Sequence, residues 1–510
     1  MKNESNFEFC DLQGLVRFAH GKLTDTCFML LKVTNANAAK QWMNKMHSSI
    51  STASAATGEL PLTALQIAFS AEGLRALGLK ESIIEGFSDE FITGMAGDEN
   101  RSRRLGDVGG NAPKHWKWGG DAAQTPHVLL LLYAHPEKAD IQAWRKKVED
   151  EYFSQAFQLL SQLPTQHHTG ETEPFGFIDG ISQPTIDWTC RQNTDQHERD
   201  RYSNLLAIGE MVLGYRNEYG QYTARPLIDP KNDQFAADLP NAEDEPSLKD
   251  FGRNGTYLVL RQLNQDVPGF WKFLDKVTNT EPAKREQLAA SMVGREREGT
   301  PLIVEHIPGV SRKDHGNHFA FDLDPKGNHC PISAHVRRTN PRTGDYPPGV
   351  NGFFSRLTKI LGFGQGPDED LVASTRFHRL LRRGRSYGSE LTPEDAINSD
   401  APVAERGLQF ICLTASISRQ FEFVQNAWCV NSKFSGLQQE QDPLLGNREP
   451  LMSGERTDHF NRPDSAGPTQ RTCHLPQFVT VRGGGYFFMP GLSALKYISS
   501  FPANGSDSSS

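Results

Sequence analysis

The segment CFMLLKV (residues 27–33) is followed almost at once by ANAAKQWMNKM (36–46), and this pair decides the fold. The first stretch is short and almost wholly apolar, which is typical of a buried strand, whereas the second has the composition of a helix. ALQIAFS (64–70) then predicts another strand, and AEGLRALGL (71–79) another helix. The chain therefore begins with a strand, helix, strand, helix unit of mixed type.

A similar order returns in the second half, although the two regions are too different in sequence to prove a duplication. We therefore predict the α+β class, with two sheet-containing halves over residues 1–165 and 166–500 and a disordered polar tail over 501–510. The segments of the second region are YLVLRQL (257–263, strand), PGFWKFLDKV (268–277, helix), LQFICLTAS (408–416, strand) and ISRQFEFVQNAW (417–428, helix).

Three further segments complete the expected architecture. HVLLLLYA (127–134) predicts a buried strand, followed by one amphipathic helix that carries Ile141, Trp144, Val148 and Tyr152 on one face. QFVTVRGGGYFFMPG (477–491) predicts two short strands about a glycine turn. The long excursion over 278–407 is rich in Arg, His, Gly and Pro, and insertions of this length are often functional.

Composition narrows the class of protein. The chain has 510 residues, 37% of them hydrophobic, and a net charge of −8, which argues against a nucleic-acid partner. The longest apolar run, VLLLLYA, is too short to span a membrane, and the first residues lack the pattern of a secretory signal. Seven scattered cysteines form no C-x-x-C pair, so we expect free thiols and a cytoplasmic protein without a membrane association.

Three short motifs carry side chains suited to chemistry. They are EPFGFIDGISQP (173–184), with Asp179; CPISAHVRRTNPR (330–342), with His335; and LLRRGRSYG (380–388), with Arg382 and Arg383. Taken singly, each has a simple structural interpretation: an Asp-Gly turn, a polar surface histidine and a solvated basic loop.

Together and in this order, the motifs resemble the dye-decolorizing peroxidases, a family of haem peroxidases. DLQGLVRFAHG (11–21) is similar to the start of that family, and GGYFFMPGLSAL (484–495) to its end, so the likeness extends over about residues 11–498. The resemblance implies two ferredoxin-like halves with antiparallel sheets, of the dimeric α+β barrel type, with haem mainly in the C-terminal half. The stretch between His335 and Arg382 looks like an added loop over 343–378.

The resemblance also implies how one haem b per chain is held. His335 matches the position of the proximal ligand of the iron. A neutral imidazole suits this role, since it binds haem iron well. Glu422 is our candidate for the carboxylate that hydrogen-bonds this imidazole. Arg342 matches the position that pairs with a haem propionate, and Arg337 is a second candidate for the same task.

On the other side of the haem, the resemblance assigns catalysis to Asp179 and Arg382. Asp179 is the expected general base and proton shuttle, and Arg382 is expected to stabilise charge as the O–O bond breaks. Arg382, rather than Arg383, has the R-x-G-x-x-Y-G spacing. Leu408 and Phe410 alternate on one strand and are expected to face the same pocket. Because a carboxylate stays ionised where imidazole is protonated, we expect activity biased toward acidic pH.

The implied reaction is reduction of hydrogen peroxide coupled to one-electron oxidation of bulky aromatic, dye-like or phenolic reductants. Such reductants are too large for a peroxide-sized pocket, so electrons are expected to pass through surface Trp or Tyr side chains or at a channel to the haem edge. Trp428 and Tyr387 lie near the motifs in the sequence. Most aromatic residues, however, belong to the core. Three alternatives stay open: a haem carrier, a haem-processing (deferrochelatase-like) protein on the same fold, and a haem-free α+β protein. A homo-oligomer is also left open.

Overall fold

The computed structural model describes residues 7–54, 61–189, 205–303, 316–317, 319–321, 324–342, 375–399, 404–464 and 467–500. The added loop predicted over 343–378 falls almost entirely outside these residues, and the tail 501–510 lies wholly outside them. No helix in the described ranges is both long enough and apolar enough to cross a membrane.

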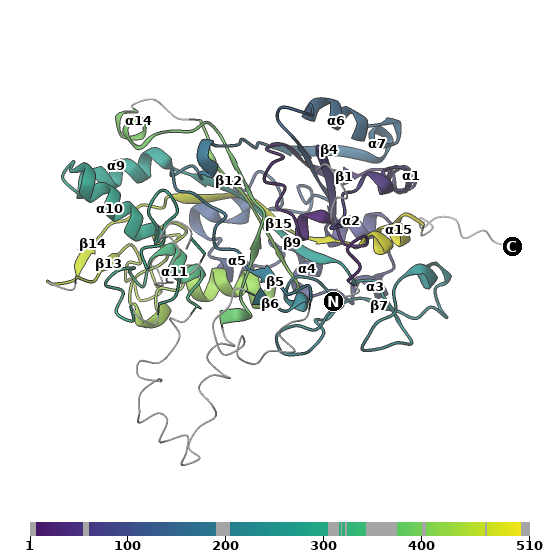
Figure 1. Ribbon diagram of the computed structural model, residues 1–510. Helices are drawn as coiled ribbons and strands as arrows, with labels where there is room; N and C mark the ends of the chain where they lie inside the picture. The colour runs from purple at the N-terminus through teal and green to yellow at the C-terminus, as the bar shows by residue number, and fades with distance from the viewer. Residues whose placement is uncertain are drawn as a thin grey trace, which may run out of the picture.

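The centre of the molecule is one open, nine-stranded sheet formed by two antiparallel groups (Figure 1). The path β10-β12-β9-β15-β2-β3-β1-β4, with β11 paired to β12, does not close into a barrel within the described residues. The main strands are β1 (Asp25–Val33), β2 (Thr63–Phe69), β3 (Val128–Ala134), β4 (Phe157–Leu163), β9 (Thr256–Gln265), β10 (Leu381–Arg382), β11 (Arg385–Tyr387), β12 (Gly407–Thr414) and β15 (Val479–Met489).

The predicted α+β class is confirmed, and each half contributes its own antiparallel strands. The two groups meet between β15 and β2, where Phe488 and Phe69 are the one paired position. The boundary at residue 165 stays a prediction. It is crossed by α15 (Leu492–Ser500), which lies against α1 (Ala36–Met46) of the N-terminal half (Figure 1). There the Ser499 hydroxyl donates to Asn44 Oδ1 at 2.6 Å.

Alternation along the strands divides the apolar side chains between the two faces of the sheet. Met29 and Leu31 face a core shared with helices such as α1, whereas Phe28 and Leu30 face a second core on the other side. The remaining helices and short strands are α2 (Ala71–Ala76), α3 (Glu81–Ile84), α4 (Asp89–Thr93), α5 (Glu99–Leu105), α6 (Ile141–Val148), α7 (Glu151–Ala156), α9 (Val267–Val277), α10 (Pro282–Val293), α11 (His335–Thr339), α14 (Pro393–Asn398), β5 (Thr185–Ile186), β6 (Leu205–Leu206), β7 (Leu227–Ile228), β8 (Lys249–Asp250), β13 (Phe460–Arg462) and β14 (Gln470–Thr472).

The glycine turn predicted near residue 484 is wrong. Strand β15 runs without a break through Gly483, Gly484 and Gly485, with a bulge between Val481 and Gly483. The glycines serve close packing instead of a turn: a Cβ on Gly483 would lie 2.4 Å from the Trp118 ring.

The single amphipathic helix predicted after β3 is also wrong, because the chain forms two helices there. Glu149 has ψ 65°, which ends α6. Asp150 then caps α7 by accepting a hydrogen bond from the Phe153 N–H at 2.9 Å. The predicted helix over 417–428 takes the form of two π-helical segments, η11 (Ser418–Glu422) and η12 (Val424–Cys429).

Candidate active site

A large cavity lies between the C-terminal strands and α11. The space not filled by atoms amounts to about 1550 Å³, including its opening to solvent. Most of its walls are apolar, which suits a flat hydrophobic ligand. The side chains facing it include Asp179, Arg295, His335, Arg382, Leu408, Phe410, Phe421, Val424, Cys429, Leu444, Val479 and Val481.

Asp179 reaches this cavity from a loop that is fixed by a buried carboxylate. Glu173 accepts hydrogen bonds from the N–H groups of Phe175 and Phe177, each at 3.0 Å, and from Gln265 Nε2 at 2.7 Å. Burial raises the pKa of Glu173 to about 7 in spite of these bonds. The loop that precedes Asp179 is therefore tied to β9 and does not depend on a simple hairpin turn.

Arg382 comes from β10 and meets Asp179 directly. Its Nη1 donates to Asp179 Oδ1 at 2.7 Å, while its backbone exchanges two hydrogen bonds with the side-chain amide of Gln183. Burial acts to raise the pKa of Asp179, but the charge of Arg382, the Gly180 N–H and the bond from Arg382 together hold it below its usual value. The carboxylate and the guanidinium thus face the cavity as an ion pair.

His335 is the first residue of α11, and its ring lines the same cavity. Its Nδ1 lies 2.8 Å from Oδ2 of Asp442, whose side chain is fully buried. A carboxylate can only accept, so Nδ1 carries the hydrogen and Nε2 keeps its lone pair. Burial lowers the pKa of His335, but the charge of Asp442 and the hydrogen bond to it together outweigh this effect, and the net pKa is raised. The second oxygen of Asp442 accepts from the N–H groups of Leu444 and Leu445 at 2.9 Å.

The carboxylate partner of His335 is therefore Asp442, and our prediction of Glu422 is wrong. Glu422 closes the π-helical segment η11, whose wider turn places Phe421 toward the cavity and Glu422 away from it. Glu422 instead accepts the hydroxyl of Tyr486 at 2.9 Å. Asp442 escaped notice because it lies in the loop QEQDPLLG (439–446), which has no motif of its own.

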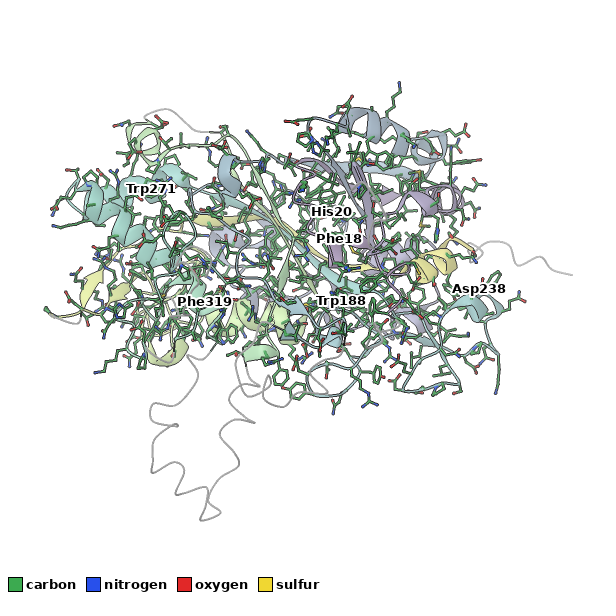
Figure 2. The ribbon with its side chains drawn as sticks, in the orientation of Figure 1. Phe18, His20, Trp188, Asp238, Trp271 and Phe319 are labelled. Atoms are coloured by element: carbon green, nitrogen blue, oxygen red, sulfur yellow. The ribbon has the colours of Figure 1, made fainter. Side chains whose placement is uncertain are left out.

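The two arginines predicted to hold a cofactor carboxylate are directed into the protein. Arg342 donates to the carbonyls of Asn317 and Phe319 at 2.8 and 2.7 Å, and its guanidinium carbon lies 3.5 Å from the centroid of the Phe319 ring, labelled in Figure 2. Arg337 pairs with Asp324 at 3.2 Å and also donates to the Cys330 carbonyl. Neither of these two arginines lines the cavity within the described residues.

Arg295, for which no motif in the sequence argues, also faces the cavity, together with Arg382 and Arg261. It donates to Ser182 Oγ and the Gly299 carbonyl at 2.6 Å and to the Gly316 carbonyl at 2.7 Å. Burial lowers its pKa to about 10, so it keeps a positive charge at neutral pH. Residue type alone could not separate it from the other arginines of the excursion.

Leu408 and Phe410 both line the cavity, as their alternation on β12 predicted. They also line a second cavity on the side of Gly21, His167 and Gly384. Its space not filled by atoms amounts to about 1260 Å³, including the opening to solvent. Asp179 and Arg382 face both spaces, so the ion pair stands where the two cavities meet. The role of Leu408 and Phe410 in limiting access to the first cavity stays a prediction.

The first cavity fits an iron porphyrin better than a bare metal ion. No cluster of three or more His, Cys, Asp or Glu side chains able to hold a metal occurs in the part of the chain that the structure describes. A single imidazole with an available lone pair suits a metal that brings its own macrocycle. Apolar walls for the ring and a buried cation, Arg295, for an acidic substituent are also present.

Comparisons with known proteins agree with this fold. Residues 2–167 match the model of the DyP dimeric alpha+beta barrel domain. A dye-decolorizing peroxidase of Mycetinis scorodonius is 29% identical, over 97% of this chain and 88% of its own. A multifunctional dye peroxidase of an Amycolatopsis species is 29% identical, over 85% of this chain and 81% of its own.

Solved structures give the same result for the fold. The crystal structure of a fungal DyP-type peroxidase from Auricularia auricula-judae superposes with a TM-score of 0.71 at 24% identity, covering 97% of this chain and all of that one. The fold and the curated relatives thus indicate an α+β oxidoreductase of the DyP-type peroxidase class. The chain is similar to dye-decolorizing peroxidases over almost its whole length, and residues 2–167 match the domain model of that family.

Proposed function

We propose that the protein binds one haem b through His335 and reduces hydrogen peroxide with the help of Asp179 and Arg382. When bound, the haem supplies an iron that accepts two oxidising equivalents from peroxide and returns them one at a time. The observation that carries the proposal is the Asp179–Arg382 contact at 2.7 Å, which faces the same cavity as His335.

Asp179 is proposed to move the proton. Its lowered pKa keeps it ionised, so one carboxylate oxygen can take a proton from the first peroxide oxygen and deliver it to the second, which leaves as water. No proton is gained or lost in this transfer, and the carboxylate is ready for the next molecule. The carboxylate keeps 42% of its side-chain surface exposed toward the cavities, so peroxide can reach it.

Arg382 is proposed to stabilise the negative charge that develops on the departing oxygen. Its side chain lines the cavity with Nη1 on Asp179, and the hydrogen bonds of its backbone to Gln183 fix its position on β10. A donor that is already oriented costs no reorganisation when the charge appears.

On the other side, His335 and Asp442 are proposed to hold the iron. The buried Asp442 carboxylate accepts the Nδ1 hydrogen, which fixes the ring and makes Nε2 a stronger donor. Arg295 is proposed to pair with a haem propionate, because the two other arginines at the cavity, Arg382 and Arg261, are already paired with Asp179 and Asp107. This proposal replaces the roles that we predicted for Arg342 and Arg337.

The reducing substrates are proposed to be bulky aromatic, dye-like or phenolic molecules that give up single electrons. The printed names of the relatives, a dye-decolorizing peroxidase and a multifunctional dye peroxidase, support this class. A haem carrier or a haem-processing protein on the same fold would need His335 and Asp442, but neither activity would need a carboxylate–guanidinium pair at the cavity.

Stopped-flow absorbance of the haem-loaded protein mixed with peroxide tests the proposal. The wild type should lose its resting Soret band quickly, whereas Asp179→Ala and Arg382→Leu should react slowly. If both variants react at the wild-type rate, the assigned roles are wrong. If the wild type binds haem but does not react with peroxide, the carrier hypothesis gains support instead.

A further inference from the structure

We propose that Tyr486 is a redox-active side chain that passes an electron to the cavity while Glu422 takes its proton. The inference rests on the proposed peroxidase function and adds the route by which a reductant outside the cavity is oxidised. It begins from the position of Glu422, which lies away from His335 and against the hydroxyl of Tyr486.

Tyr486 lies one aromatic ring behind the cavity wall. It belongs to β15, and its own side chain is only 2% exposed. Its ring centroid is 6.2 Å from that of Phe421, which lines the cavity, and Phe421 is 6.3 Å from Phe410, which lines it too. An electron leaving Tyr486 therefore crosses one layer of aromatic side chains to reach the cofactor space.

Glu422 is a hydrogen-bond partner of Tyr486 that can accept its proton. The phenol donates to Glu422 Oε1 at 2.9 Å. Arg101 Nε lies 3.0 Å from the same oxygen, and Arg104 Nη2 lies 3.6 Å from Oε2. Burial raises the pKa of Glu422 in spite of the Tyr486 hydrogen bond and these two cations, which makes the carboxylate a stronger proton acceptor. A phenol that loses an electron becomes a strong acid, and the proton can cross this hydrogen bond without leaving the site.

The step balances in atoms and charge. Tyr486 loses one electron, and its O–H bond breaks; the proton forms a new O–H bond on Glu422, which becomes neutral. The electron reduces the centre that peroxide has oxidised in the cavity. One electron from the aromatic reductant of the proposed reaction then restores Tyr486, and the proton returns from Glu422 to the phenol.

The group also connects the cavity to the surface. Glu422 is 6% exposed, but the side chain of Arg104 on α5 is 50% exposed. The pair of Tyr486 and Glu422 thus lies between the cavity-lining Phe421 and a side chain in contact with solvent. A reductant too large to enter the cavity can be oxidised from this side.

Tyr387 provides a matched control. It is as buried as Tyr486, and its hydroxyl donates at 3.1 Å to the carbonyl of Leu263, another residue of the cavity wall. A backbone carbonyl cannot keep a proton, so oxidation of Tyr387 has no comparable path. The sequence alone pointed to Tyr387 and Trp428, whereas the hydrogen bond to a carboxylate points to Tyr486.

The test is electron paramagnetic resonance of the haem-loaded full chain, frozen after mixing with one equivalent of peroxide without reductant. The wild type should give a tyrosyl radical that is narrowed by ring-deuterated tyrosine. Tyr486→Phe should lose this signal, Glu422→Gln should weaken it because the amide cannot accept the proton, and Tyr387→Phe should keep it. The loss of the resting Soret band should be as fast in all four proteins.

Each other result counts against the inference. A tyrosyl signal that survives in Tyr486→Phe, or that disappears only in Tyr387→Phe, overturns the assignment of the residue. A wild type that reacts with peroxide but forms no tyrosyl radical overturns the inference and leaves the peroxidase function intact. If the Soret band of the wild type does not respond to peroxide, both the inference and the proposed peroxidase function are wrong.

Discussion

His335 and Asp442 are separated by 107 residues in the chain, yet Nδ1 of the imidazole lies 2.8 Å from a carboxylate oxygen that is completely buried. Asp442 is itself held by two backbone N–H groups, so the ring cannot turn without breaking a buried network. The pair fixes both the direction of Nε2 and its electron-donating strength.

Replacing Asp442 by Asn should weaken haem binding about 10- to 100-fold and raise the reduction potential of the iron. A neutral amide accepts a weaker hydrogen bond than a carboxylate, so the imidazole gains less negative charge and donates less electron density to the iron. Haem titration and potentiometry measure the two effects. Glu422→Gln is the matched control and should change neither, since Glu422 contacts Tyr486 and not His335. Equal potentials in wild type and Asp442→Asn would contradict the role.

His335→Ala should bind haem poorly and lose the Soret band of a histidine-ligated iron. His329→Ala removes an exposed imidazole six residues earlier and should bind haem like the wild type. Addition of free imidazole should restore part of the spectrum of His335→Ala, which would separate loss of the ligand from loss of the fold. Normal haem spectra in His335→Ala would assign the iron ligand to another residue.

Asp179→Asn should slow the reaction with peroxide about 10²- to 10⁴-fold, the range for removal of a general base. Arg382→Leu should slow it about 10²- to 10³-fold through loss of one stabilising donor. Arg385→Leu is the neighbouring control, because that guanidinium donates to the carbonyls of Ala19 and His20. The measurement is the second-order rate constant from stopped flow.

The pH dependence should follow the ionisation of Asp179. The base is active when deprotonated, so activity falls as the pH drops through its pKa; because Arg382 holds that pKa below its usual value, activity should persist into the acidic range. In Arg382→Leu the pKa of Asp179 should rise, and the acidic limb of the pH profile of kcat/KM should move to higher pH. Arg382→Lys, which keeps the charge, should move it less. A wild-type optimum above neutrality would refute the assignment.

Stability should depend on a buried ion pair far from the cavity. Arg225, whose side chain is 3% exposed, donates to Asp250 at 2.6 Å, and Asp250 has no exposed side-chain surface. Asp250→Ala removes this partner, while Asp244 still pairs with Arg225 at 2.5 Å, and should lower the free energy of unfolding by about 1–3 kcal/mol. Glu281→Ala breaks an exposed pair with Lys284 and should cost about 1 kcal/mol or less. Urea denaturation compares the two.

Local patterns in the sequence were sufficient for the long strands β1, β2, β3, β9 and β12, but not for β4, β10 and β11. VLLLLYA predicted β3 to the residue, because a short apolar run buried on both faces has a simple signature. The glycines of β15 led to the wrong prediction of a turn, because the sequence does not show that Trp118 packs on Gly483. The break after α6 was missed for a similar reason: it depends on Asp150 capping the next helix.

The candidate site was predictable where motifs carried it and not elsewhere. Asp179, His335 and Arg382 lie in recognisable segments, and all three line one cavity. Asp442 and Arg295 are brought there by tertiary packing, and nothing in their own neighbourhoods distinguishes them. Glu422 was our candidate for the carboxylate partner of His335, but the π-helical turn directs it to Tyr486.

Strand β15 lies between β9 and β2, and its Val479 and Val481 form part of the cavity wall. It is also the last strand of the sheet to be made by the ribosome. A nascent chain can fold the four N-terminal strands early, but it lacks both the central strand of the sheet and one wall of the cavity until translation has passed residue 489. The cavity that we propose for the cofactor is therefore complete only after β15 has joined the sheet.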